Sequence, residues 1–312
     1  MDPPGTRGPT NVAQVQNLTI IGAPTSAGAY APGQEDGPAA MREQGIAAAL
    51  AAAGYDVTDA GDVERFRWRP DPESPRAANA AAVAERARQV AERVAAVPAG
   101  DRVLVLGGDC TVGVGTVAGL TRRGARPGLV YFDRHADLNV PESTIDGALD
   151  WMGVAHMLDV DGRTAALAGV GGVLPLLEPA RLAFLGLGRV SDPEEAVMYA
   201  RRLGAVTLEE AIADPEAAVR AALEQLADCA ELAVHFDVDV LDYLDAPLAE
   251  NTDRDPGVPL AAARAILAVL LADERTTALT ITDLNPHHGA EDGSTVRRLV
   301  DAVAAAYAAG DV

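Results

Sequence analysis

Short apolar runs alternate with alanine-rich segments along most of this chain, and that alternation limits the fold more than any other feature. The apolar runs lie at residues 18–21, 102–106, 128–132, 182–187, 232–236 and 278–281. Segments with a helical pattern lie at residues 38–53, 76–96, 214–229, 260–272 and 293–308. Continuous runs of Val, Leu and Ile are typical of strands buried on both faces. The alternation therefore predicts an α/β fold, a three-layer α/β/α sandwich with a central, mainly parallel sheet.

The length of 312 residues suits one large α/β domain or two small ones. No linker rich in Gly, Ser or Pro divides the sequence. We therefore expect a flexible N-terminal tail over residues 1–17 and a single catalytic domain over residues 18–312.

The chain is strongly acidic, with 46 Asp and Glu against 25 Lys and Arg and a net charge of −21. Because it lacks a basic stripe, we expect neither nucleic acid nor an anionic membrane as a partner. Two cysteines are too few for a disulfide framework of a secreted protein. No run reaches the ~18–20 apolar residues of a membrane span, and the start lacks a signal-peptide core. These features predict a cytoplasmic protein.

Polar segments directly follow four of the predicted strands. They are GGDC at 107–110, DRHAD at 133–137, DVD at 237–239 and DLNPHH at 283–288. Ligands of parallel α/β sheets bind beyond the carboxyl ends of the strands. These segments are therefore where we expect the functional site.

Metal-binding side chains alternate within two of these segments. Asp133, His135 and Asp137 are spaced two residues apart, and so are Asp237 and Asp239. Alternate residues of an extended chain share a face, so these groups would crowd into one small volume. Without cations the repulsion would cost several kcal/mol. Oxygen ligands with an imidazole suit Mn²⁺ or a similar ion, and two such ions would activate a shared water.

For both cysteines and for His235, a structural role has to be weighed against metal binding. Cys110 follows a GGD turn at a strand end, which favours a metal ligand over a small buried hydrophobic residue. His235 is expected to be structural and to point to the opposite face of its strand from Asp237. Cys229 is expected to be a core residue.

Several motifs together resemble those of the arginase/agmatinase ureohydrolase family. They are LGGDC (106–110), FDRHADLNVPES (132–143), HFDVDVLD (235–242), TDLNP (282–286) and IIGAPTSAGAYAPGQEDGPAAMREQGI (20–46). The resemblance implies an α/β/α fold with a parallel sheet. It also implies hydrolysis of guanidino groups to urea with two Mn²⁺ ions, and a homo-oligomer, either a trimer or a hexamer.

The resemblance also implies how the ligands divide between the ions. One ion would be held by Cys110, Asp133, Asp137 and Asp237, and the other by His135, Asp133, Asp237 and Asp239. Asp133 and Asp237 would bridge the pair. The activated water would attack the guanidinium carbon, releasing urea and an amine.

Cys110 stands where the family usually has a histidine. A thiolate is softer than an imidazole and carries a charge, so the preference for Mn²⁺ should weaken relative to Fe²⁺, Zn²⁺ or Ni²⁺. The same exchange resembles hydroxyarginine-hydrolysing relatives.

Two aspartates replace catalytic residues of the family. Asp150 stands where arginases carry a proton-shuttling histidine, so it needs a raised pKa or else binds a cationic part of the substrate. His156, His287 or His288 could supply the proton instead. Asp283 replaces a glutamate that pairs with the guanidinium, and its shorter side chain places the substrate ~1.5 Å deeper.

The loop over residues 138–149 departs from the arginine-specific pattern. Asn139 and Thr144 match residues that read the α-carboxylate of arginine, but Asp146 and Ala148 replace a serine and an asparagine. An aspartate there would repel a carboxylate. We therefore expect a substrate other than plain L-arginine.

Three further residues are candidates for substrate binding. Asp192 lies near an acidic position that holds the α-amino group in the family. Glu250 and Asn251 are candidates either for substrate contacts or for bonds that stabilise their own loop.

The sequence thus predicts a dinuclear, manganese-dependent ureohydrolase acting on a small guanidino or amidino compound. Agmatine-like or N-hydroxyguanidine compounds suit the extra acidic residues. One alternative is a metal-binding family member without hydrolysis that acts as a regulatory or assembly subunit. Another is a hydrolase of a formimino C–N bond.

Overall fold

A sheet of eight strands forms the centre of the computed structural model, which describes residues 15–310. Its strand order is β2-β1-β3-β8-β7-β4-β5-β6, and every neighbouring pair is parallel. The strands are β1 (Asn17–Gly22), β2 (Asp56–Asp62), β3 (Arg102–Leu106), β4 (Gly128–Phe132), β5 (Leu182–Leu187), β6 (Ala205–Thr207), β7 (Leu232–Asp237) and β8 (Thr276–Thr282). Most of the predicted tail, residues 1–14, lies outside the described residues, and Asn17 already belongs to β1.

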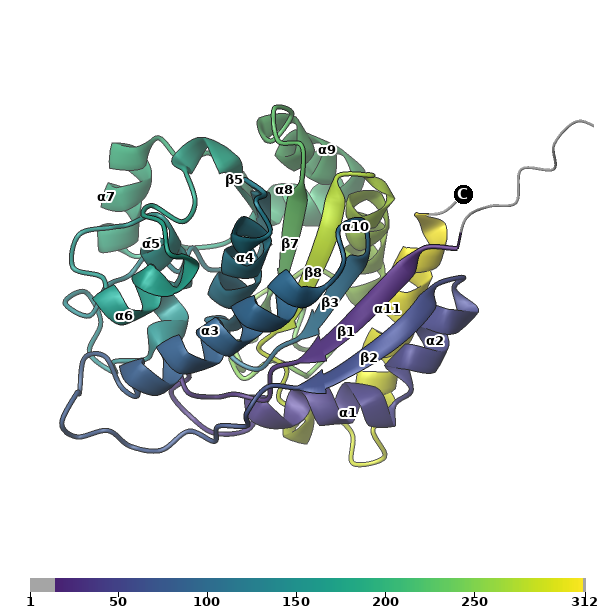
Figure 1. The fold of residues 1–312 in the computed structure, drawn as a ribbon, viewed down its shortest axis with the longest axis horizontal. Coiled ribbons are helices and arrows are strands. Elements are labelled where there is room, and N and C mark those ends of the chain that lie inside the picture. The colour runs from purple at the N-terminus through teal and green to yellow at the C-terminus, as the bar shows by residue number, and fades with distance from the viewer. Residues whose placement is uncertain (1–14, 311–312) are drawn as a thin grey trace, which may run out of the picture.

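Helices cover both faces of this sheet (Figure 1). They are α1 (Gly37–Glu43), α2 (Ile46–Ala52), α3 (Ala80–Ala96), α4 (Val112–Arg122), α5 (Gly153–Met157), α6 (Ala165–Ala168), α7 (Asp192–Arg201), α8 (Leu208–Ala213), α9 (Pro215–Gln225), α10 (Leu260–Ala272) and α11 (Ser294–Ala309). α3 and α4 lie on one side of the sheet and α10 and α11 on the other. The predicted three-layer α/β/α fold is confirmed.

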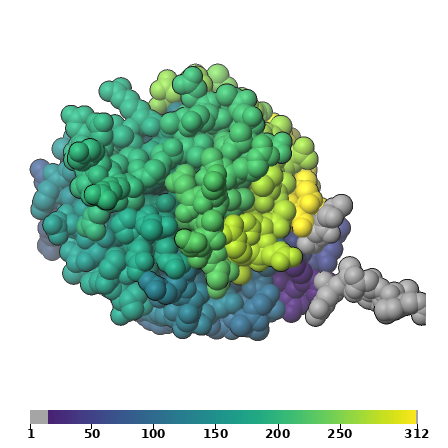
Figure 2. All heavy atoms as spheres, turned by 90° about the horizontal axis from the view of Figure 1, so that it is seen from above, coloured from purple at the N-terminus to yellow at the C-terminus, as the bar shows by residue number. Residues whose placement is uncertain are grey.

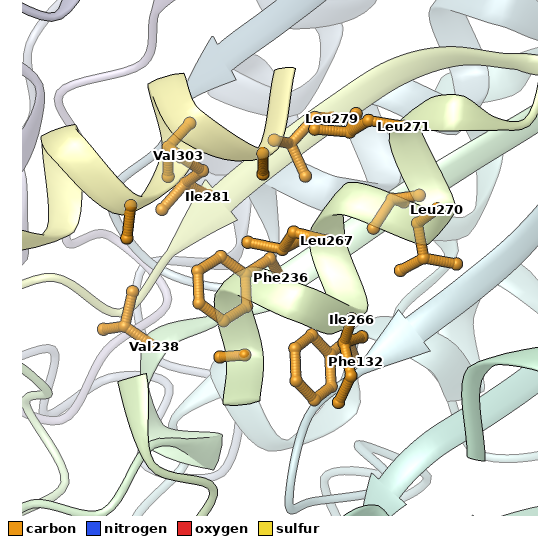
Figure 3. Close-up of a cluster of buried hydrophobic side chains, with 14 of the residues drawn as sticks. Phe132, Phe236, Val238, Ile266, Leu267, Leu270, Leu271, Leu279, Ile281 and Val303 are labelled. Atoms are coloured by element: carbon orange, nitrogen blue, oxygen red, sulfur yellow. The ribbon is translucent and has the colours of Figure 1, made fainter. Parts of the chain in front are cut away.

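The sheet separates two apolar cores because successive side chains of a strand point to opposite faces. In β4, Phe132 belongs to one core and Tyr131 to the other. The Phe132 ring stacks on Phe236 of β7, with ring centroids 5.3 Å apart. Ile266 and Leu267 of α10 lie beside these rings (Figure 3). The strands that carry the metal motifs are therefore held by packing on both sides.

The structure adds elements that the sequence pattern did not indicate. β2 reads DVTDAGD and is largely exposed at the sheet edge, so it has no apolar run. The expected helix over 38–53 is two helices, because Gly45 between them has φ +83°. α4 contains three glycines, which weaken a helical pattern.

The last helix, α11, packs near the sheet edge formed by β2 and β1. Tyr307 of α11 packs edge-on against Tyr55, with ring centroids 5.2 Å apart. In the space-filling view the yellow end of the chain lies next to its purple start (Figure 2). Among residues 15–310, no helix combines the length and the apolar character needed to cross a bilayer.

The four central strands β3, β8, β7 and β4 are the ones followed by the predicted polar segments. Backbone bonds join their ends: Gly107 N donates to Ile281 O at 2.7 Å, and Asp283 N donates to Gly108 O at 2.8 Å. Segments far apart in the sequence therefore meet at one edge of the sheet.

Close packing of α4 on α3 depends on a glycine. A Cβ added at Gly115 would lie 2.6 Å from the Ala87 carbonyl oxygen. We expect Gly115→Ala to lower the free energy of unfolding by about 1–3 kcal/mol, measured by urea denaturation followed by circular dichroism. Gly169→Ala is the control, because an added Cβ there meets nothing within 4 Å. Equal losses in the two variants would contradict this packing.

Candidate active site

One narrow pocket lies where the four polar segments meet. Its lining consists of Tyr30, Cys110, Asp133, His135, Asp137, Asp150, Trp151, Asp237, Asp239, Asn251 and Asp283. All six predicted metal ligands lie there, as do two of the three predicted catalytic residues. The structure therefore brings these side chains together, and their roles stay predictions.

The two aspartate motifs turn away from their strands in the same way. The Asp133 carboxylate accepts a bond from His135 N at 2.7 Å, and the Asp237 carboxylate accepts one from Asp239 N at 2.7 Å. Such a bond to the backbone two residues on is a standard use of aspartate in turns. In each motif the first aspartate thus fixes the position of the next metal-binding side chain.

Possible ligand atoms form three overlapping groups, within each of which all atoms lie within 4.8 Å of one another. The groups are Cys110 with Asp133, His235 and Asp237; Asp133 with His135 and Asp239; and Asp237 with Asp239 and Asp283. Asp133, Asp237 and Asp239 each belong to two groups. Shared carboxylates of this kind can bridge two ions.

His235 belongs to the first group, so the prediction that it points away from Asp237 is wrong. The two residues are two positions apart in β7 and therefore share a face. The His235 ring stacks on Tyr131 with centroids 4.3 Å apart, and its Nε2 lies 3.0 Å from Thr282 Oγ1. Its Nδ1 has no hydrogen-bond partner among residues 15–310. Burial lowers the pKa of His235 to about 3, so the ring is neutral and able to bind a metal.

Two pocket aspartates have strained backbones. Asp137 has φ +49° and Asp283 has φ +65°, in the left-handed region that few non-glycine residues adopt. Asp137 is in none of the three ligand groups, and its carboxylate accepts a bond from the Tyr131 hydroxyl. In the part of the chain that the structure describes, Oδ2 of Asp283 has no partner. That oxygen belongs to a residue of the pocket lining.

Negative charge is crowded at this site. Burial, reinforced by neighbouring carboxylates, raises the pKa of Asp133, Asp237 and Asp283 well above the usual value. Burial and Asp237 likewise raise the pKa of the Cys110 thiol, which contacts the Asp237 carboxylate. Divalent cations would reverse this cost, because they bind the deprotonated forms of these same groups. The donor set therefore fits a pair of metal ions.

His135 partly balances the charge. Burial acts to lower its pKa, but the Asp239 carboxylate, 2.9 Å from Nδ1, raises it to about 9. Burial also raises the pKa of Asp137 to about 7. A single imidazolium faces several acids, so it does not neutralise them.

Asp150 lies against Cys110. Its Oδ1 accepts a bond from Cys110 N at 2.5 Å, and burial and the Asp109 carboxylate raise its pKa well above the usual value. Gln34, which the sequence did not single out, bonds both Asp150 and Asp283 from the glycine-rich loop. One amide therefore holds the two predicted catalytic carboxylates.

Two aromatic residues of the lining were also missed. The rings of Tyr30 and Trp151 are stacked, with centroids 6.0 Å apart and an interplanar angle of 3°. Trp151 meets His135 edge to face at 5.6 Å. The adjacency of Trp151 to Asp150 was the one signal that could have identified it.

The predicted histidine donor lies elsewhere. His156 is fully buried, its Nδ1 is 2.6 Å from Met152 O, and its Nε2 accepts a bond from Thr164 N at 2.9 Å. Both ring nitrogens thus have partners, Nδ1 at the start of its own helix and Nε2 at Thr164, which argues against proton transfer. His287 and His288 are also outside the lining, each with a ring nitrogen in another contact.

Four predicted substrate contacts lie outside the lining: Asn139, Thr144, Asp146 and Asp192. The Asn139 side chain accepts a bond from Ser143 Oγ at 2.9 Å and so braces its own turn. Asp192 is exposed at the first position of α7. Their roles as substrate ligands stay predictions without support from the geometry.

The loop after β7 contains two predicted substrate residues, Glu250 and Asn251, and only one of them lines the pocket. Glu250 is outside the lining, but its carboxylate accepts a bond from Asn285, and its backbone oxygen accepts one from the Tyr30 hydroxyl at 2.9 Å. Asn251 lines the pocket, with Nδ2 3.4 Å from Asp239 Oδ2. Glu250 therefore supports the wall, and Asn251 forms part of it.

A parallel sheet with buried carboxylates gathered beyond its central strands is the architecture of an α/β protein with a site for divalent metals. Residues 16–308 match the model of the arginase family, and the chain belongs to that family.

Individual relatives agree with this assignment. The arginase of Bacillus caldovelox is 29% identical over 279 residues, which span 86% of this chain and 91% of that protein. Its crystal structure matches with a TM-score of 0.84 at 24% identity, over 94% of this chain and 98% of the other. A formimidoylglutamase from Bacillus subtilis matches with a TM-score of 0.74 at 17% identity, over 97% and 89% of the two chains. At these identities the solved structures show the fold alone.

Removing one of the crowded carboxylates should raise the melting midpoint of the metal-free protein and reduce the stabilisation that metal binding gives. We expect metal-free Asp237→Asn to melt about 2–4 °C above metal-free wild type, because a buried repulsion is relieved. Mn²⁺ should raise the midpoint of wild type more than that of the variant. Scanning calorimetry in chelator and in Mn²⁺ measures both, and Asp161→Asn, at an exposed position, is the control. A lower midpoint for the metal-free variant would contradict the repulsion.

Proposed function

We propose that this protein is a dinuclear metal-dependent amidinohydrolase that cleaves a C–N bond of a guanidino compound and releases urea and an amine. The observation that carries the proposal is the overlap of three buried ligand groups in one pocket. Membership of the arginase family supports the reaction class.

Six predicted ligands would hold the metal pair, with Asp133 and Asp237 as shared carboxylates. The other four are Cys110, His135, Asp137 and Asp239. Bound there, two divalent ions would supply an activated water and polarise the substrate. Mn²⁺ is the expected ion, with Fe²⁺, Zn²⁺ or Ni²⁺ as alternatives because of the sulfur ligand.

Asp283 would bind the guanidino group, and the hydrogen bonding of its carboxylate supports this role. One oxygen of its carboxylate is held by Gln34 and the other has no partner among residues 15–310. A fixed carboxylate with a free oxygen can accept charge-assisted bonds from a guanidinium N–H. Asp150, bonded to Gln34 and to the Cys110 backbone, offers a second acidic group for the substrate or for the proton of the leaving amine.

The substrate would differ from plain L-arginine. The residues lining the pocket within the described chain include neither Lys nor Arg, whereas seven of the eleven are acidic or a thiol. A carboxylate brought into this pocket would lose water and meet these acidic groups, with no Lys or Arg of the lining to pair with it. A cationic or neutral-headed guanidino compound avoids this penalty.

A panel of guanidino compounds tests the reaction. After reconstitution with Mn²⁺, Fe²⁺, Zn²⁺ or Ni²⁺, we expect urea release from at least one compound, measured colorimetrically. Asp283→Asn should lower kcat/KM by about 100-fold or more, because it removes the charge that pairs with the guanidinium. Asp161→Asn is the matched control.

Other outcomes of the panel would favour the alternatives. Two ions per chain with no turnover would indicate a non-hydrolytic member with a regulatory or assembly role. Formamide or ammonia released from a formimino compound added to the panel, with no urea from any guanidino compound, would indicate a formimino hydrolase.

Metal choice should depend on Cys110. With equimolar Mn²⁺ and Zn²⁺, we expect Cys110→His to bind a lower ratio of Zn²⁺ to Mn²⁺ than wild type, because an imidazole is a harder ligand than a thiolate. Inductively coupled plasma mass spectrometry measures the ratio. Cys229→Ala, at the second buried cysteine outside the lining, should leave it unchanged. The same ratio in wild type and Cys110→His would refute a role for sulfur.

A further inference from the structure

The stacked rings of Tyr30 and Trp151 stand between the acidic pocket and the surface. Both residues line the pocket, and Tyr30 is 39% exposed. Trp151 also meets His135 edge to face. The pair therefore bounds the pocket between a metal-binding histidine and the solvent.

Each ring is anchored through its polar end. The Trp151 indole N–H donates to Asp146 Oδ2 at 3.1 Å. The Tyr30 hydroxyl donates to Glu250 O at 2.9 Å. Because both donors are already bonded, the pair offers a ligand mainly aromatic surface. This surface suits an apolar chain or a delocalised cation.

The cavity below the rings is small. Its volume is about 10 Å³, which is close to the room that one water molecule needs. A guanidino group that reaches Asp283 needs more room than this, so side chains of the lining, which includes both rings, have to move. Substrate entry would change the surroundings of Trp151.

We propose, on the basis of the function proposed above, that Tyr30 and Trp151 form an aromatic mouth that selects guanidino compounds with an apolar chain and no carboxylate. The rings contact the chain of the substrate, and the acids below bind its guanidinium. A carboxylate on the chain would find no Lys or Arg in the lining to pair with it, and it would approach the Asp146 carboxylate that holds the Trp151 indole.

Trp151 itself provides a signal that is independent of turnover. The chain has two tryptophans, so Trp68→Phe leaves Trp151 as the single one, and Trp68 is outside the lining. Two matched probes differ in the carboxylate: n-butylguanidine lacks one, and 4-guanidinobutyrate carries one. In the Mn²⁺-loaded Trp68→Phe protein, we expect a saturable fluorescence change with n-butylguanidine. We expect at least about tenfold weaker binding of 4-guanidinobutyrate.

Two substitutions at Tyr30 separate the ring from the hydroxyl. In the Trp68→Phe background, Tyr30→Leu should weaken n-butylguanidine binding by about fivefold to tenfold, because the aromatic face is lost. Tyr30→Phe keeps the ring and should stay within about twofold. If Tyr30→Leu fails to fold, the two probes in Trp68→Phe still decide the proposal.

The possible results distinguish this proposal from the reaction itself. A saturable change with n-butylguanidine, at least about tenfold weaker binding of 4-guanidinobutyrate and no urea from any compound of the panel would support the aromatic mouth and refute the hydrolysis. Urea release with equal kcat/KM for both probes would refute the mouth and leave the hydrolysis standing. Equal affinity for both probes, no change with n-butylguanidine, or unchanged affinity in Tyr30→Leu would also overturn the mouth.

Discussion

Mutual repulsion among buried carboxylates is the constraint on which the rest of this structure depends. Asp133, Asp237 and Asp239 lie close together where water cannot screen them. A flexible chain would let them separate, but here each follows a strand packed on both faces. The stacked rings of Phe132 and Phe236, directly before the two motifs, belong to the core under α10. Stability from the two cores thus offsets a local cost that metal ions can remove.

Strand order turns separate motifs into one site. β3, β8, β7 and β4 are neighbours although they are far apart in the sequence. The motifs could be predicted because each is local: an apolar run followed by polar residues at alternate positions. Gln34 could not, because its partner Asp283 is 249 residues away. The edge strands β2 and β6 were missed for a related reason, since exposed or very short strands lack the apolar run that marks buried ones.

Apart from Asn251, the predicted substrate residues lie outside the pocket lining whereas the predicted metal ligands lie in it, and local hydrogen bonding explains the difference. Asn139 braces its own turn through Ser143, and Asp192 occupies the first turn of α7, where a negative charge is favourable. A metal ligand is held at a strand end by the whole sheet. The orientation of a loop side chain is set by hydrogen bonds within its own loop. A few substitutions in that loop can therefore turn the side chain in another direction.

The departures from the family pattern act together in space. Cys110 and Asp150 each stand where the resemblance implies a histidine, and Asp150 bonds the backbone of Cys110. Replacing two neutral imidazoles by groups that can be anionic makes this side of the pocket more negative by up to two charges. Trp151, the next residue, covers the same side and meets His135. Added negative charge beneath an aromatic surface attracts a cation and disfavours an anion. Under the function proposed above, the same substitutions would both alter metal binding and favour a substrate without a carboxylate.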